Sequence, residues 1–171
     1  LGNQNERPPL AKDMAVFRDT VFYANTTSKH RFYLTLLAAG SPNGVQANDT
    51  ITIGGIAYTA KASETVASAQ FKVYSAGSAA QNVRDTALSL VRVINRYASS
   101  LVYAYYLSGP DDLPGMILIQ GRTVGQAAFV AISSRGTCWN PALPTSGVPQ
   151  ISTNDANKNA VFYSKSSPPE A

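Results

Sequence analysis

Few side chains in this sequence could do acid–base chemistry, and they are scattered. The only adjacent acidic pair is Asp111-Asp112, which lies in the Gly- and Pro-rich segment Ser108–Gly115. Two carboxyl groups facing each other across a cleft could hydrolyse a glycosidic bond. Aspartates in a turn, however, more often accept hydrogen bonds from backbone amides. We therefore favour a structural role for the pair, with a hydrolase that gathers Asp111, Asp112 or Glu64 as an alternative.

The sequence also has few residues that could bind a metal ion or act as a nucleophile. The single histidine, His30, stands between Lys29 and Arg31, whose positive charges disfavour a bound cation. One cysteine, Cys138, allows neither an internal disulfide nor a multi-cysteine zinc site. No Gly-x-Ser-x-Gly segment presents a nucleophilic serine. We expect no enzyme activity, no catalytic residue and no metal or cofactor.

Aromatic residues are the remaining candidates for a binding site. Tyr103, Tyr105 and Tyr106 follow closely on Tyr97, and flat aromatic rings can stack on sugars or bases. Alternation along a strand predicts Tyr103 and Tyr105 on one face and Tyr106 on the other. The favoured reading is that these tyrosines border a core or an oligomer interface. Trp139 is a further candidate, although we expect it to hold its loop against the body of the protein.

Charge and hydropathy exclude some classes of protein. The net charge is +4 over 171 residues, but the 14 Lys and Arg residues are dispersed, with the largest local excess at 29–31. No dedicated nucleic-acid site is expected from this pattern. The apolar runs are far shorter than the roughly 20 residues that cross a bilayer, so we expect no membrane span.

One segment, residues 79–97, has a sustained helical period. Its apolar residues fall on one stripe of a helix, which must pack on a sheet. The stripe consists of Val83, Ala87, Leu90, Val91 and Ile94. Ser78 and Gln81 have the spacing of a capping box, which predicts where the helix begins.

The rest of the chain is typical of strands and turns. Gly54-Gly55 between two alternating segments predicts a tight hairpin over 50–60. Further strands are expected at 14–24, 31–38, 69–74, 102–107, 115–120, 128–133 and 159–164. Residues 136–159 should form a surface loop. The fold is thus predicted to be α+β, a mainly antiparallel sheet with one long amphipathic helix packed on it and short flanking β segments.

The two flanks are similar in composition, which favours an insertion. We expect 1–28 to be a lead-in and a β-hairpin of a parent β domain, and 159–171 to be the return strand and an extended exit. Residues 29–158 would then form an inserted α+β domain.

A resemblance supports this arrangement. Asp49–Thr59 (DTITIGGIAYT), followed by a helix that ends Val91–Asn95 (VRVIN), resembles a module of tailed-bacteriophage virion proteins. Residues 14–27 look like a β-propeller blade segment, and 161–171 (VFYSKSSPPEA) are similar to a segment of large phage tail proteins. The family brings no catalytic residues to carry over.

The resemblance implies a function. A non-enzymatic structural component of the virion is expected, in the tail or neck, that forms homo-oligomers and contacts other virion proteins. The alternative is a carbohydrate- or host-receptor-binding module of a phage adhesin that uses Tyr103, Tyr105 or Trp139 to bind a host-surface glycan or receptor.

Overall fold

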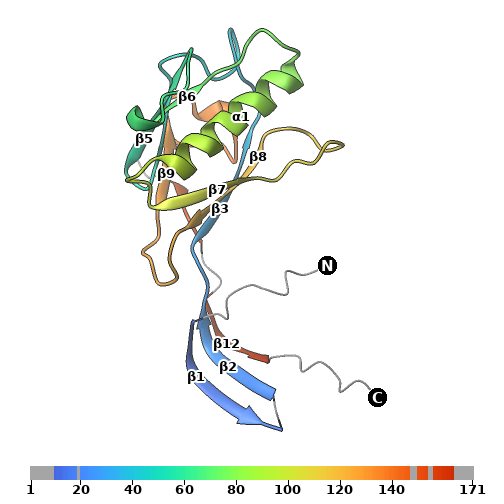
Figure 1. Ribbon diagram of the computed structural model, residues 1–171, viewed down its shortest axis with the longest axis vertical. Coiled ribbons are helices and arrows are strands. Elements are labelled where there is room, and N and C mark those ends of the chain that lie inside the picture. Colours follow the sequence, from blue (N-terminus) through green and yellow to red (C-terminus); the bar gives the residue numbers. More distant parts are fainter. Residues whose placement is uncertain (1–9, 19, 147–149, 154–155, 164–171) are drawn as a thin grey trace.

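The computed structural model describes residues 10–18, 20–146, 150–153 and 156–163 (Figure 1). Within them the chain forms one α-helix, α1 (Ala79–Arg96), and three β-sheets, two of which pack with the helix. The predicted α+β fold is confirmed. The predicted capping box is also present, since the Ser78 hydroxyl accepts from the Gln81 amide N–H and the Gln81 side chain accepts from the Ser78 N–H.

The first sheet is wholly antiparallel, in the order β10-β3-β8-β7. Its strands are β3 (Arg31–Leu36), β7 (Val102–Tyr106), β8 (Met116–Gly121) and β10 (Trp139–Asn140). β8 lies at the centre of this sheet between strands that are far apart in the sequence, so its register depends on packing rather than on a local turn alone.

The second sheet has the order β11-β9-β4-β5-β6. Its strands are β4 (Thr50–Ile53), β5 (Ile56–Lys61), β6 (Gln70–Lys72), β9 (Val130–Ser133) and β11 (Gln150–Ile151). Gly54 and Gly55 make the predicted hairpin turn with φ of 58° and 83°, which glycine adopts without strain. β6 is parallel to β5, because the chain crosses over through the 3₁₀ turn η1 (Val66–Ser68) before it pairs.

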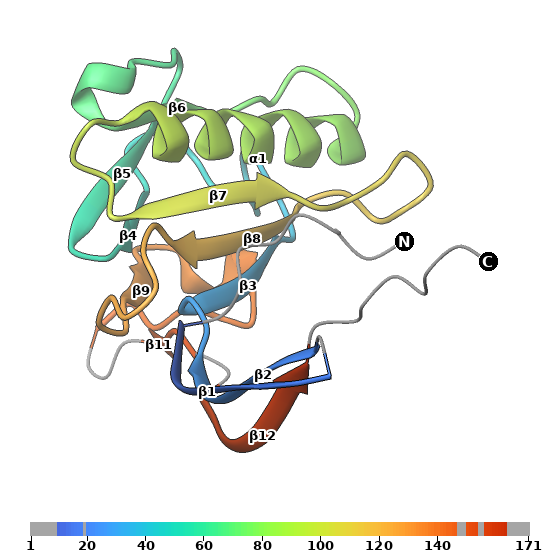
Figure 2. The same cartoon turned by 60° about the horizontal axis from the view of Figure 1, so that its bottom comes forward.

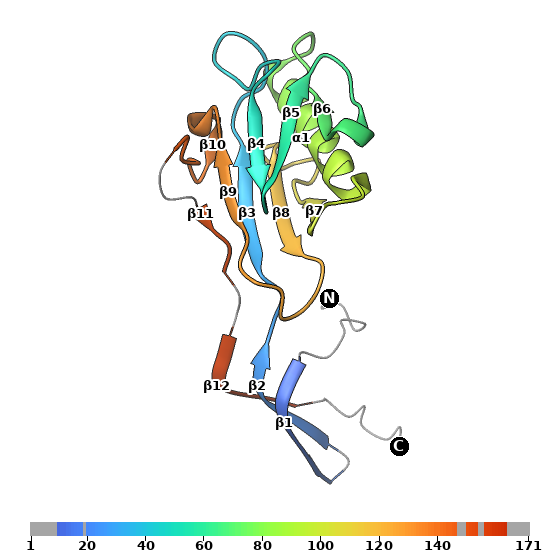
Figure 3. The ribbon, with the colours of Figure 1, turned by 90° about the vertical axis from the view of Figure 1, so that its left-hand side faces the viewer.

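The third sheet contains the first and last strands of the described chain. β1 (Leu10–Phe17) and β2 (Thr20–Thr27) form the predicted hairpin, and β12 (Ala156–Tyr163) pairs with β2 in antiparallel orientation. This sheet lies apart from the two larger sheets (Figures 1 and 3). The first and last strands of the described chain therefore belong to one sheet, with β2 between them.

The hydrophobic core lies between the inner faces of the two larger sheets and α1. Leu90 and Ile94 of the helix are fully buried against strand residues such as Ile51, Tyr58 and Ile117. The predicted apolar stripe needs one correction, since Val91 is only half-buried and Val93 is fully buried.

A polar stripe on α1 faces the open edge of β6. The Thr86 and Ser89 hydroxyls accept hydrogen bonds from the backbone N–H groups of Tyr74 (3.0 Å) and Lys72 (2.8 Å). One turn earlier, the Asn82 amide bonds both the N–H and the C=O of Gly77. All three polar side chains are buried. Part-buried backbone groups at and just beyond this edge are therefore satisfied by the helix instead of by another strand.

The opposite edge, that of β7, is covered in the same way (Figure 2). The Asn95 amide donates to Ala104 O and accepts from Ala104 N, both at 2.7 Å. At Val102 the Ser100 hydroxyl and the Arg122 Nε donate to the carbonyl oxygen. Asn95 thus closes the gap between the helix and the first sheet, as Ser89 and Thr86 do for the second.

An ion pair strengthens the contact between α1 and the β5–β6 crossover. Arg92 binds both carboxylate oxygens of Glu64, with Nη2 2.7 Å from Oε2, and the Ser89 hydroxyl donates to the same oxygen at 2.5 Å. These hydrogen bonds, led by that from Arg92, lower the pKa of Glu64 below its ordinary value.

The expectation of a surface loop over 136–159 is wrong for much of that segment. It contains the 3₁₀ turn η2 (Gly136–Cys138) as well as β10 and β11, and Cys138, Trp139 and Leu143 are buried. Thr153 exchanges two backbone hydrogen bonds with Arg31, at the start of β3. The segment therefore links the two larger sheets on the side away from α1.

Truncation of the helix face tests this architecture. Leu90→Ala should lower the free energy of unfolding by about 2–5 kcal/mol, because it leaves a cavity at the centre of the core. Val91→Ala, its half-buried neighbour, should cost clearly less. Chemical denaturation measures both values. A loss below about 1 kcal/mol for Leu90→Ala, or equal losses, would contradict the helix assignment.

Candidate interaction surface

The predicted tyrosines lie on β7, and the strand sorts them as its alternation predicts. Tyr103 and Tyr105 are exposed on the outer face of the first sheet, the face away from the core. Tyr106 is turned the other way, where it packs against the core and its hydroxyl accepts from the Gly115 N–H at 3.2 Å. Tyr106 is therefore a structural residue.

Trp139 does hold its loop against the body of the protein. Its side chain is 2% exposed, and its indole N–H donates to the Ser133 hydroxyl at 3.1 Å. A ring buried in this way offers no face to a ligand. This removes Trp139 from the candidate binding residues and leaves it as a core residue that fixes β10 beside β3.

The register of the first sheet brings other residues beside Tyr103 and Tyr105. Tyr33 of β3 pairs with Leu118 of β8, which pairs in turn with Tyr105. A row of two tyrosines and one leucine thus crosses three strands. Tyr33 and Tyr105 are 46% and 45% exposed, so the row is open to solvent.

Two further rows flank this one. We define the tyrosine face as the nine outward positions of the three rows. They are Arg31, Gln120 and Tyr103, then Tyr33, Leu118 and Tyr105, then Thr35, Met116 and Leu107. Because strands lie about 4.8 Å apart and residues rise about 3.3 Å along a strand, the Cα positions span about 10 by 13 Å.

The charged groups of the tyrosine face are all positive and lie at one end. None of the nine positions is acidic, and a cation lies at one end only, at Arg31. Arg122 adds a second cation there, with its guanidinium carbon 4.4 Å from the centre of the Tyr103 ring and its Nε hydrogen-bonded to Val102 O. The tyrosine face is thus rich in tyrosine, methionine and arginine and has no acidic residue. This composition is typical of the centres of protein–protein interfaces.

Two of the three acidic candidates, Asp112 and Glu64, make structural contacts, and the third, Asp111, is exposed. The Asp112 carboxylate accepts from the Gly109 N–H at 2.8 Å, as expected for a turn, and Glu64 is paired with Arg92. Asp49 is paired with Arg135 at 2.7 Å. No three His, Cys, Asp or Glu residues of the described segments converge as metal ligands would.

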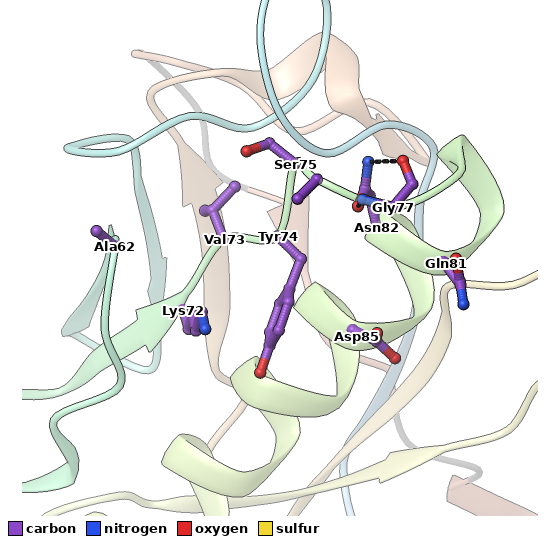
Figure 4. A pocket seen from close by; sticks show the side chains of 10 residues that line it. Ala62, Lys72, Val73, Tyr74, Ser75, Gly77, Gln81, Asn82 and Asp85 are labelled. Carbon is purple, nitrogen blue, oxygen red and sulfur yellow. Dashed lines mark hydrogen bonds between the residues drawn. The ribbon is translucent and has the colours of Figure 1, made fainter.

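The described part of the chain also has a hollow of about 420 Å³ between the exit of β6 and the start of α1 (Figure 4). Tyr74, Gln81 and Asp85 line it, but Asn82 is already bonded to Gly77. The Lys72 Nζ lies 4.5 Å from the centre of the Tyr74 ring.

The cysteine is no better placed for chemistry than the hollow. Burial raises the pKa of the Cys138 thiol, which disfavours the reactive thiolate. Neither feature supplies a nucleophile with a base.

Comparisons with protein-family models, curated proteins and solved structures find no match. Among the described residues, no helix has both the length and the apolar character needed to cross a membrane. The geometry of the tyrosine face is therefore the main structural guide to function.

The sequence placed Tyr103 and Tyr105 together on one face, but it did not bring Tyr33, Leu118 and Met116 beside them. Alternation within 31–36 would have placed Tyr33 outward, because Phe32 and Leu34 are the apolar positions between polar ones. The missing information was that β3 pairs with β8, which no local pattern gives.

The contrast between an exposed and a buried aromatic residue can be measured. Tyr105→Thr keeps a β-branched residue on the strand and should change the free energy of unfolding by no more than about 0.5 kcal/mol. Trp139→Ala should cost about 3–5 kcal/mol, because the indole fills the core. Thermal and chemical denaturation of both variants measures this difference. A large loss for Tyr105→Thr would contradict its position on an open face.

Proposed function

We propose that this chain is a non-enzymatic structural domain of a tailed-bacteriophage virion, located in the tail or neck, that acts through contacts between subunits. The observation that carries the proposal is the tyrosine face, an exposed surface of interface-like composition on a rigid sheet. The resemblance of the hairpin, the helix end and the two flanks to virion proteins supports it.

The residues of the resembling motifs have structural contacts. In the hairpin segment, Asp49 pairs with Arg135 and Ile51 is buried. In the helix-end segment, Ile94 is in the core and Asn95 binds the edge of β7. Motifs that build a fold, rather than a reaction centre, fit a protein whose task is assembly.

We further propose that the chain's middle is an insertion. Residues 1–28 and 159–171 would belong to a parent β domain, and 29–158 would form the inserted domain. The pairing of β2 with β12 supports this division, since it brings the entry and exit of the middle segment together.

A carbohydrate- or host-receptor-binding module is the second candidate. Tyr103 and Tyr105 expose their side chains on one face, and the Arg122 guanidinium stacks on Tyr103. Aromatic rings and a guanidinium are groups that hold sugars and their acidic substituents. Trp139 has no part in this candidate because it is buried.

Electron microscopy and glycan arrays separate the two candidates. The polypeptide that contains this chain should form regular rings or spikes as its concentration rises, and the chain should bind no glycan specifically. Specific binding that Tyr105→Thr abolishes, without any assembly of the parent polypeptide, would contradict the structural role and favour the adhesin.

A further inference from the structure

We infer that the free edge of β1 binds a further β-strand, supplied by a segment of the parent polypeptide from outside residues 1–171. This inference rests on the proposed insertion, in which the third sheet belongs to a parent β domain. It goes beyond that proposal because it names the edge at which the parent domain continues and the kind of segment that pairs there.

The third sheet has one regular edge that no described strand covers. β1 stands at the end of the order β1-β2-β12, and its pairing with β2 runs from Leu10 to Phe17 without a register shift. The pairing of β12 with β2, in contrast, is interrupted by a register shift between Asn157 and Val161. A bulge disfavours the addition of a strand, whereas a regular edge is a template for one. The edge of β1 is therefore the one that can accept a partner.

The tight turn of the hairpin determines which groups of β1 point outward. Phe17 and Thr20 close a two-residue turn in which Arg18 has a φ of 48°, so the two closing residues exchange backbone hydrogen bonds. Bonded and non-bonded pairs alternate along an antiparallel ladder. The backbone N–H and C=O groups of Val16 and Met14 accordingly point away from β2, towards the free edge.

The side chains of β1 indicate burial on both sides of the sheet. Met14 and Val16 project from one face and are 69% and 74% exposed, while Phe17 projects from the other face and is 62% exposed. Residues 14–17 and 21–24 are continuous apolar runs, which are typical of strands buried on both faces. The helix and the two larger sheets lie too far from this sheet to cover it (Figures 1 and 3). The strand that pairs with β1 should therefore be apolar on both faces as well.

The source of the strand follows from the chain itself. Residues 1–9 end in Pro8-Pro9 and residues 164–171 contain Pro168-Pro169, and proline has no N–H to donate to a ladder. These segments are thus poor strand formers by sequence. A segment of the parent polypeptide is tethered near β1 at a high effective concentration, which a second copy in solution does not match. The parent polypeptide is therefore favoured over a second copy as the source.

Amide hydrogen exchange of the parent polypeptide tests the inference, with residues 1–171 alone as the reference. In the isolated chain the amides of Met14 and Val16 should exchange quickly and that of Ala15 slowly, because only Ala15 donates to β2. In the parent polypeptide the Met14 and Val16 amides should exchange about 100-fold more slowly or better, since they donate to the added strand.

Two substitutions at Val16 make the test specific. Val16→Pro removes an outward N–H but no bond to β2, so the slow exchange of Met14 in the parent polypeptide should be lost. Val16→Thr keeps both the N–H and the β-branched shape and should keep that slow exchange. Slow exchange of Ala15 in both variants shows that the hairpin is folded.

Two results would overturn the inference. Fast exchange of Met14 and Val16 in the parent polypeptide, equal to that in the isolated chain, would mean that the edge is unpaired. Slow exchange already in the isolated chain, lost on dilution, would assign the edge to a second copy. Electron microscopy judges the proposed function separately. Rings or spikes with a fast-exchanging β1 edge would leave that function standing without the inference, and slow exchange without assembly would do the reverse.

Discussion

The structure depends on how the unpaired backbone groups at two strand edges are satisfied. β6 ends the second sheet and β7 ends the first, and each edge would otherwise leave N–H and C=O groups without partners beside the core. Side chains of α1 supply those partners, from Thr86 and Ser89 on one side and from Asn95 on the other. The helix therefore closes the gap between two sheets as well as covering their core.

This closure explains the sequence of the helix. The apolar stripe alone would allow several rotations of α1 about its axis, since any sheet face can accept leucine and isoleucine. The hydrogen bonds of Thr86, Ser89 and Asn95 permit only one. Buried polar groups that must be paired often specify a unique arrangement in this way, although their net contribution to stability is modest. The helix covers the inner side of the first sheet, and its outer side is left open as the tyrosine face.

Local rules predicted the parts of the fold that depend on neighbouring residues. The capping box at Ser78, the turn at Gly54-Gly55 and the faces of Tyr103 and Tyr105 follow from φ preferences and side-chain periodicity. Features that depend on distant pairing were missed. The sequence predicted that Trp139 holds its loop against the body of the protein, but not that β10 pairs with β3, a contact across about a hundred residues of sequence that no periodicity encodes.

Amide hydrogen exchange measures the central claim directly. If α1 satisfies the two edges, the amide hydrogens of Lys72, Tyr74 and Ala104 should exchange as slowly as those within the strand ladders, because their release requires the helix to separate from the sheets. Exchange of these three amides at the rate of an exposed loop, while the ladder amides stay protected, would contradict the account.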